Sequence, residues 1–308
     1  MTERSDKGCT LCPLACGADR ALSPGVCGVG GARGIGERDP YETAFVARAA
    51  RHFYEEPPIS GVNGSGAIFF SGCNMACVFC QNIDISASVK GRPIDAEELC
   101  GIMLRLEELG SHNINLVTPA PHVRMLLKAI PLARDRGLKI PIVYNTNAYE
   151  TVEAIKSLNG LIDIYLPDLK YAGRIAAARY SGREDYFAYA SRAVEEMYAQ
   201  CGELIADDNG IAQRGVIIRH LVLPGSVDET RGVLDYIASA FPLSINISLM
   251  SQYTPIEGMR PPLDRRLMKR EYDRAVDYAL ALGFTNLLLQ ERSSAESGFT
   301  PEFSGYFE

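Results

Sequence analysis

The sequence lacks any apolar run long enough to cross a bilayer, and its N-terminus, Met-Thr-Glu-Arg-Ser-Asp-Lys, lacks the apolar core of a signal peptide. We therefore expect a cytoplasmic protein with no membrane partner. Thiols stay reduced in the cytoplasm, so the nine cysteines of the chain are better interpreted as metal ligands and core residues than as disulfides.

The chain also lacks an excess of basic residues. It has 31 Lys and Arg against 38 Asp and Glu, a formal net charge of −7. A general nucleic-acid binder needs a basic face that displaces counterions, so we expect no nucleic-acid partner. With 47% hydrophobic and 22% charged residues, the 308-residue chain has the profile of a globular enzyme, and its length is normal for an α/β barrel.

A compact group of three cysteines lacks the fourth ligand of a closed metal site. Cys73, Cys77 and Cys80 form a C-x3-C-x2-C loop directly after the apolar run 67–70. An all-protein [4Fe–4S] site uses four cysteines, and a closed zinc site uses four ligands. Three thiolates on a four-iron cluster leave one iron open for a ligand that the protein does not supply. The alternatives are a loop of buried thiols or half of a zinc site.

From about residue 64 the sequence alternates apolar runs with amphipathic helical segments. Repeated strand-then-helix units predict a parallel sheet, closed fully or partly into a (β/α)6 barrel, with function at the carboxyl ends of its strands. We expect this barrel to span residues 61–308, and residues 1–60, rich in loops, glycine and cysteine, to form a small N-terminal extension. The expected strands cover residues 67–71, 113–117, 140–145, 161–166, 215–222, 244–249 and 285–290.

Several helix ends carry local signals. Asp95 and Glu98 have the spacing of a capping box, and Gly110 is placed to end that helix. The segment 174–200 is interpreted as two helices broken at residues 181–182. Two further starts are predicted, with a capping box at Ser226 and Glu229 before residues 233–240, and with Asp264 capping residues 265–282, which Gly283 ends.

A second cysteine group lies near the N-terminus. Cys9, Cys12, Cys16 and Cys27 read C-x2-C-x3-C-x10-C in a segment poor in core-forming residues. Metal binding supplies folding energy to a segment that cannot fold by burial alone. The ligand set suits a second [4Fe–4S] cluster or a structural zinc ion, and the sequence leaves both open beside four ordinary thiols.

The three-cysteine loop, with an aromatic residue, Phe79, before its last cysteine, resembles the signature of the radical S-adenosylmethionine (SAM) superfamily. The chain is similar to the activating-enzyme branch, typified by the activating enzyme of pyruvate formate-lyase, and to uncharacterised homologues of it with an N-terminal cysteine motif. The resemblance implies that the three cysteines bind a [4Fe–4S] cluster, that SAM chelates the open iron, and that reductive cleavage gives methionine and a 5′-deoxyadenosyl radical. The matching stretches are residues 71–82, 144–149, 166–170, 218–225 and 249–253.

The resemblance also implies residues that hold SAM. Asp168 and Lys170 end one predicted strand two residues apart, which places both on one face, and the family has an equivalent pair at SAM, with the lysine against the methionyl carboxylate. His220 is expected to be structural, because it neighbours Arg219 on a strand and therefore faces the opposite side. The remaining expected cofactor-binding residues are Phe79, Thr118, Asn145, Asn147, Arg219 and Tyr253.

Two features depart from the family pattern. Many members carry Gly-Gly-Glu at the second strand to hold the SAM amino group, whereas this chain reads Thr118-Pro-Ala. Tyr253 stands where the activating enzyme of pyruvate formate-lyase has a histidine.

The resemblance implies a protein glycine as substrate, converted to a glycyl radical, which makes a glycyl radical enzyme or peptide the expected partner. Radical modification of another peptide or of a small molecule is the alternative. A reducing partner such as flavodoxin or ferredoxin is also expected. A non-catalytic iron–sulfur electron carrier, or a binding protein stapled by a metal, is the alternative from a different class.

Overall fold

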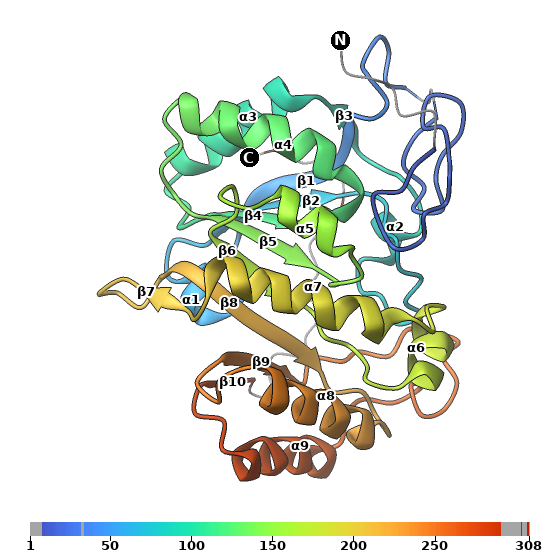
Figure 1. Ribbon diagram of the computed structural model, residues 1–308, viewed down its shortest axis with the longest axis vertical. Coiled ribbons are helices and arrows are strands. Elements are labelled where there is room, and N and C mark those ends of the chain that lie inside the picture. The colour runs from blue at the N-terminus through green and yellow to red at the C-terminus, as the bar shows by residue number, and fades with distance from the viewer. Residues whose placement is uncertain (1–7, 32–33, 291–302, 304–306, 308) are drawn as a thin grey trace.

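The computed structural model describes residues 8–31, 34–290, 303 and 307 (Figure 1). The strands of this part form a ten-stranded sheet in the order β10-β9-β8-β6-β5-β4-β2-β1-β3, with β7 paired to β8. The strands are β1 (Ala44–His52), β2 (Ser65–Phe70), β3 (Arg92–Ile94), β4 (Ile114–Val117), β5 (Ile142–Thr146), β6 (Ile164–Pro167), β7 (Ile205–Ala206), β8 (Ala212–Leu221), β9 (Asn246–Met250) and β10 (Leu287–Leu289).

Parallel pairing joins β2, β4, β5, β6, β8, β9 and β10 in turn. These are the seven strands expected from the sequence. The apolar runs of β2, β4, β5 and β6 are buried throughout, as parallel strands covered on both faces require, whereas β10 at the edge is partly exposed. The sheet ends at β10 on one side and β3 on the other. The predicted α/β class is therefore confirmed in its partial form, an open barrel in the described residues.

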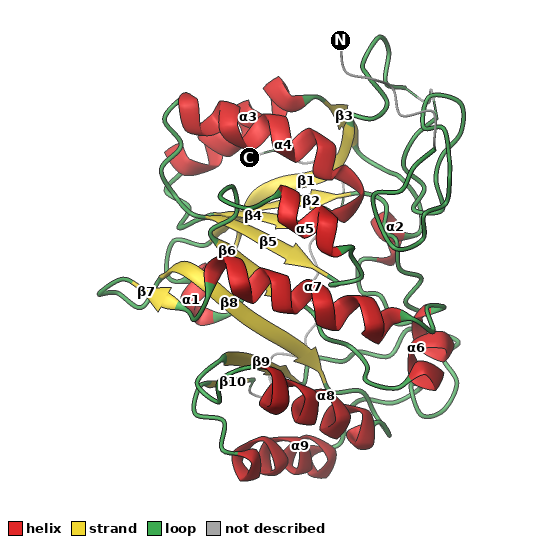
Figure 2. Cartoon of the chain, viewed as in Figure 1, coloured by secondary structure: helices red, strands yellow, loops and turns green. Residues whose placement is uncertain are grey.

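Helices cover the outside of the sheet (Figure 2). In chain order they are α1 (Pro57–Ser60), α2 (Ile83–Ser86), α3 (Ala96–Glu108), α4 (Val123–Asp135), α5 (Val152–Ser157), α6 (Arg174–Ser181), α7 (Tyr186–Cys201), α8 (Val227–Ala240) and α9 (Lys269–Leu282), with a short 3-10 turn at Ala120–His122. The pairs α3 and α4, α5 and α7, and α8 and α9 pack side by side, and α7 packs on β6 and β8. Their apolar faces complete the main core: Leu99, Met103, Ile130 and Met197 are fully buried, each stabilising the fold by about 2 kcal/mol.

Local sequence signals predicted some helix ends correctly and others wrongly. The box at Asp95 and Glu98 has both of its hydrogen bonds and begins α3, and Gly283 ends α9 in the left-handed conformation. The break at residues 181–182 separates α6 from α7. These three predictions are confirmed.

The predicted helix start at Ser226 is confirmed in position but not in its capping bond, and the predicted start at Asp264 is wrong. Helix α8 begins at Val227, and the side chain of Ser226 makes no capping bond. Glu229 instead accepts hydrogen bonds from the backbone N–H groups of residues 172 and 173, which competes with a capping role. Helix α9 begins only at Lys269, where Glu271 accepts from the N–H of Met268.

The first sixty residues contribute a strand to the sheet. Strand β1 lies inside the segment predicted as an extension, yet it pairs antiparallel with β2 and β3. The loop-rich cysteine segment therefore ends before Ala44, and the chain that follows it belongs to the sheet.

Candidate functional site

A cavity of about 230 Å³ opens where the parallel strands end. Each strand from β2 to β9 in the parallel series contributes its carboxyl end or the loop after it, as expected for this class of fold. Of the residues predicted from the sequence, the cavity is lined by Cys73, Cys77, Phe79, Cys80, Thr118, Asn145, Asn147, Asp168, Lys170 and Arg219.

The three thiols of the loop are free and each has a hydrogen-bond partner. The Cys77 Sγ lies 3.0 Å from the Ser181 hydroxyl, the Cys80 Sγ accepts from Ser86 at 3.3 Å, and the Cys73 Sγ accepts from the Met75 N–H at 3.4 Å. Burial raises the pKa of Cys73 to about 12, so a metal that binds here must displace its proton. Three thiols around one cavity fit the predicted cluster site.

Beneath the cysteine loop lies a buried network of opposite charges. The Lys170 Nζ lies 2.6 Å from the Asp168 Oδ2, and the Arg219 Nε lies 2.9 Å from the Asp168 Oδ1. Burial favours the neutral form of Asp168, but the charges of Lys170 and Arg219 outweigh it and lower the pKa of that carboxyl. Burial likewise opposes the charge on Lys170, and Asp168 outweighs it and raises the pKa of the amine. All three groups are therefore charged at neutral pH.

Two acidic residues that sequence reasoning missed complete this network. Glu55 accepts from the Arg219 Nη1 at 3.0 Å and from the Asn115 Nδ2 at 3.0 Å, and it lines the cavity. Glu56 is 8% exposed, and burial raises its pKa although Arg219 lies 3.9 Å away. Sequence reasoning could have found both residues through β1. Once β1 is recognised as a strand of the sheet, Glu55 and Glu56 after it are expected near the cavity.

Two asparagines connect the charged network to the cysteine loop. The Asn145 Oδ1 accepts from the Arg219 Nη2 at 2.7 Å. The Asn147 Nδ2 donates to the Cys73 Sγ at 3.4 Å and to the Asn74 Oδ1 at 2.9 Å. Both side chains point toward groups that a cofactor in the cavity would contact.

Thr118 holds an uncommon backbone conformation at the end of β4. Its φ of 59° lies in the left-handed region, which a β-branched residue rarely adopts, and its N–H donates to the Asn145 carbonyl at 2.9 Å. Strain of this kind persists only where the surrounding structure imposes it, and it concentrates at functional sites.

Tyr253 lies outside the lining of the cavity. It is 1% exposed, its hydroxyl donates to the Leu263 carbonyl at 2.5 Å, and its ring packs edge-on against Phe79 at 6.3 Å between centroids. Its observed contact with the site runs through Phe79.

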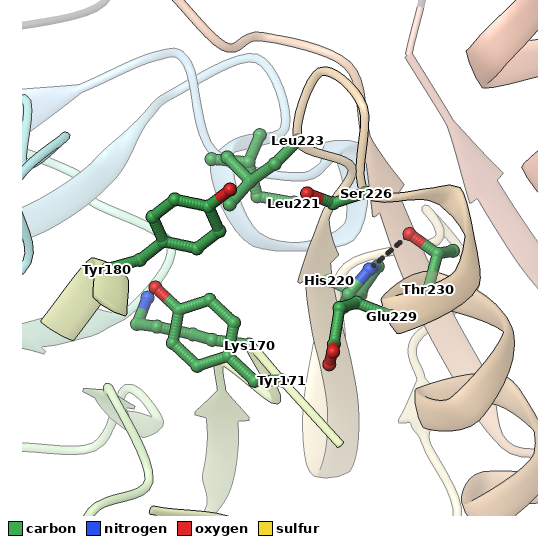
Figure 3. Close-up of a pocket in the computed structure, with 9 residues that line it drawn as sticks. All are labelled: Lys170, Tyr171, Tyr180, His220, Leu221, Leu223, Ser226, Glu229 and Thr230. Atoms are coloured by element: carbon green, nitrogen blue, oxygen red, sulfur yellow. Dashed lines mark hydrogen bonds between the residues drawn. The ribbon is translucent and has the colours of Figure 1, made fainter. Parts of the chain in front are cut away.

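His220 points away from the cavity, toward α8, where Figure 3 shows it directed at Thr230. Its Nε2 lies 2.9 Å from the Thr230 Oγ1, and its Nδ1 lies 2.7 Å from the Leu169 carbonyl. Burial lowers its pKa to about 4. A neutral imidazole with both nitrogens engaged joins β8 to its neighbours, which is a packing role.

The N-terminal cysteines gather around a second, much smaller cavity. Its lining includes Arg20, Asn74 and the four thiols of Cys9, Cys12, Cys16 and Cys27. Within the described part of the chain, no group of three or more His, Cys, Asp or Glu side chains is arranged to share a single metal ion. A four-iron cluster has another requirement, because each thiolate binds a different iron.

Comparison with known proteins gives this geometry a family context. A family model described as the radical SAM superfamily matches residues 67–237, more than half of the chain. The uncharacterised protein MJ0674 of Methanocaldococcus jannaschii is 31% identical over 285 residues, which cover 89% of this chain and 74% of that protein.

The similar solved structures have lower sequence identity to this chain than that relative has. SuiB of Streptococcus suis bound to S-adenosylmethionine matches with a TM-score of 0.49 and 14% identity over 71% of this chain, and the match spans about half, 48%, of the SuiB chain. A domain of a pyruvate-formate lyase-activating enzyme from Bacteroides vulgatus matches with a TM-score of 0.40 and 11% identity, over 55% of this chain and 92% of that domain. Neither similarity identifies a substrate for this chain. Among the described residues, no helix has both the length and the apolar character that a bilayer span requires.

Proposed function

Because the chain belongs to the radical SAM superfamily, we propose that Cys73, Cys77 and Cys80 each bind one iron of a [4Fe–4S] cluster and that SAM fills the remaining cavity. The enzyme generates a 5′-deoxyadenosyl radical from SAM. The observation that carries the assignment of residues is that the three thiols and the Asp168–Lys170 pair line the same cavity. When bound, the cluster supplies the electron that cleaves the sulfonium.

The charged network is proposed to orient SAM. Lys170 donates to the methionyl carboxylate, a charge-assisted contact that Asp168 aligns from below. Arg219 holds Asp168 from its other side, and Asn145 offers an amide to the ribose hydroxyls.

Residues of the cysteine loop and β4 are proposed to complete the SAM site. Phe79 packs beside the adenosyl group, and Asn147 holds the Cys73 thiolate. Without Gly-Gly-Glu, the amino group of SAM is proposed to bind the Thr118 hydroxyl and the carbonyls around it, which the left-handed turn directs into the cavity.

The substrate is proposed to be a glycine of a protein, from which the radical abstracts hydrogen. The motif resemblance to activating enzymes supports this class. Exposed apolar residues near the cavity also support a protein partner. Tyr54, which lines it, is 54% exposed, and Val78 of the cysteine loop and Ile83 at the start of α2 are 42% and 43% exposed. A flavodoxin or ferredoxin is proposed as the electron donor.

Deuterium transfer tests the substrate class. A glycyl radical enzyme deuterated at glycine is incubated with the reconstituted protein, SAM and dithionite without oxygen. The proposal predicts deuterium in the 5′-deoxyadenosine that forms and a glycyl radical signal in electron paramagnetic resonance.

Other outcomes separate the alternatives. Release of 5′-deoxyadenosine without deuterium contradicts the glycyl substrate and favours another peptide or a small molecule. A full cluster that releases none identifies a non-catalytic electron carrier.

A further inference from the structure

We propose that Cys9, Cys12, Cys16 and Cys27 hold a second [4Fe–4S] cluster that passes electrons to the first through the contact between Cys27 and Cys73. The metal site stands on the N-terminal cysteines alone, whereas the electron transfer rests on the proposed function of the first site. Three features support it: the four thiols line one small cavity, a buried arginine lies beside them, and the two ligand loops are in contact.

The N-terminal backbone folds back on itself around its cysteines, of which Cys9 and Cys27 are buried and Cys12 and Cys16 half-buried. The Cys9 N–H donates to the Ala18 carbonyl at 2.9 Å, and the Gly17 N–H donates to the Cys9 carbonyl at 3.1 Å. Cys9 and Cys27 are 6% and 8% exposed. A loop that encloses its cysteines in this way has little apolar core of its own and gains its stability from a bound metal.

Gly25 brings the backbone against two of the thiols. A Cβ at this position would lie 3.3 Å from the Cys16 Sγ and 3.5 Å from the Cys27 Sγ. A side chain here would contact both sulfurs, so glycine keeps the space between them open for a metal group.

A buried arginine lines the same cavity. Arg20 is 2% exposed, and its Nη1 donates to the Pro121 carbonyl at 2.8 Å. Its Nε is buried and has no hydrogen-bond partner in the part of the chain that the structure describes. A buried donor that carries positive charge is costly without an acceptor, and the sulfurs of an anionic cluster supply one.

Gly30 packs closely against Arg20. A Cβ on Gly30, whose φ is 107°, would lie 3.0 Å from the Cα, Cβ and Cγ of Arg20. The local fold is therefore shaped to bring the guanidinium to the cysteines.

The two ligand loops touch directly. The Cys73 N–H donates to the Cys27 carbonyl at 3.2 Å, so one hydrogen bond and a few covalent bonds connect the two thiols. Asn74 lines the N-terminal cavity and also accepts from Asn147 at the first site. Zinc has no redox chemistry and therefore passes no electrons across this contact. A [4Fe–4S] cluster accepts and donates electrons, which makes it the better occupant.

One electron passes from a protein donor through the second cluster to the first. A low-potential one-electron donor of the flavodoxin or ferredoxin class reduces the second cluster by one electron. That cluster is oxidised again when the electron passes to the first, and no bond forms or breaks in this step. The first cluster then delivers the electron to SAM, whose C–S bond breaks.

Metal analysis tests the occupant. The double variant Cys12→Ser/Cys16→Ser is compared with Cys201→Ser, a matched control whose thiol is buried at the end of α7 and belongs to neither cavity. We expect about eight irons and eight sulfides per chain in the parent and the control, and about four of each in the double variant. Four irons with one zinc in the parent would overturn the second cluster.

Arg20→Gln provides a test that keeps all the ligands. The iron count should stay at that of the parent, while a redox titration should show a lower reduction potential for the second cluster, because the nearby positive charge favours the reduced form. An unchanged potential would contradict the contact between Arg20 and the cluster.

Two electron sources test the transfer. Dithionite reduces the first cluster directly, so the Cys12→Ser/Cys16→Ser protein should form 5′-deoxyadenosine at the parent rate with it. With reduced flavodoxin the rate should fall by about tenfold or more. Equal rates with flavodoxin would overturn the transfer. A parent protein that holds both clusters and forms no 5′-deoxyadenosine with dithionite would instead refute the function proposed for the first site.

Discussion

Lys170 and Asp168 form an ion pair, 2.6 Å from nitrogen to oxygen, in the wall of the cavity. Their side chains are 17% and 19% exposed, and both line the cavity. Arg219 also contacts Asp168, so the carboxylate keeps a partner when the lysine is removed. This arrangement permits a clean test of the lysine.

Lys170→Met should weaken SAM binding about 10- to 150-fold, because a charge-assisted hydrogen bond contributes about 1.5–3 kcal/mol. Equilibrium binding of SAM to the anaerobic protein measures the effect. Lys156→Met, at an exposed position of α5, is the control and should bind SAM as the parent does. Equal affinities of the two variants, at equal iron content, would refute the role of Lys170.

Among the elements, β5 shows how a strand end is fixed beside the site. Glu150 accepts hydrogen bonds from the hydroxyls of Tyr144, at 2.7 Å, and Thr146, so it clamps the last residues of the strand. Asn145 and Asn147 project from this clamped segment. Burial raises the pKa of Glu150 to about 7.

The raised pKa gives a stability that depends on pH. Between about 4.5, the ordinary pKa of Glu150, and about 7, the folded state keeps a proton that the unfolded state has lost, so stability falls as pH rises through this range. The cost of the charged carboxylate at pH 8 is about 3 kcal/mol.

Glu150→Gln should therefore raise the thermal midpoint at pH 8 and change it little near pH 5. Glu153→Gln, at an exposed position of α5, is the control and should show no such dependence. A gap between parent and Glu150→Gln that is the same at both pH values would contradict the buried proton.

Elements were predictable where a local signal and burial agreed. The parallel strands β2, β4, β5 and β6 are apolar runs buried throughout, so their hydrophobic pattern alone was enough to find them. Strand β1 was missed because it lies among loops, and its Ala-Arg-Ala-Ala pattern has no strand period. The capping bond at Ser226 failed because Glu229 accepts from the backbone N–H groups of residues 172 and 173 instead. The start at Asp264 failed because Glu271 caps the N–H of Met268, so that α9 begins only at Lys269.

Site residues were predictable where their spacing is local. The cysteine loop and the Asp168–Lys170 pair are read within a few residues of sequence. Glu55 was missed because its role depends on a contact with Arg219, 164 residues away. Tyr253 shows the reverse, since its motif position did not reveal that its side chain turns from the cavity toward Leu263.

Across the whole molecule, the open barrel brings the carboxyl ends of its strands to one cavity and packs the N-terminal cysteine loop against it. Figure 1 shows that loop beside α2, which follows the three-cysteine loop. In this arrangement the strand ends surround the proposed cofactor site. The N-terminal segment contacts the three-cysteine loop through the hydrogen bond between Cys73 and Cys27.

Cleavage of SAM by the anaerobically reconstituted protein with dithionite tests whether Cys73, Cys77 and Cys80 hold the cluster that generates the radical. We expect 5′-deoxyadenosine and methionine in equal amounts from the parent and none from Cys73→Ala/Cys77→Ala/Cys80→Ala. Absence of both products from a parent protein with a full cluster at these three cysteines would contradict this role.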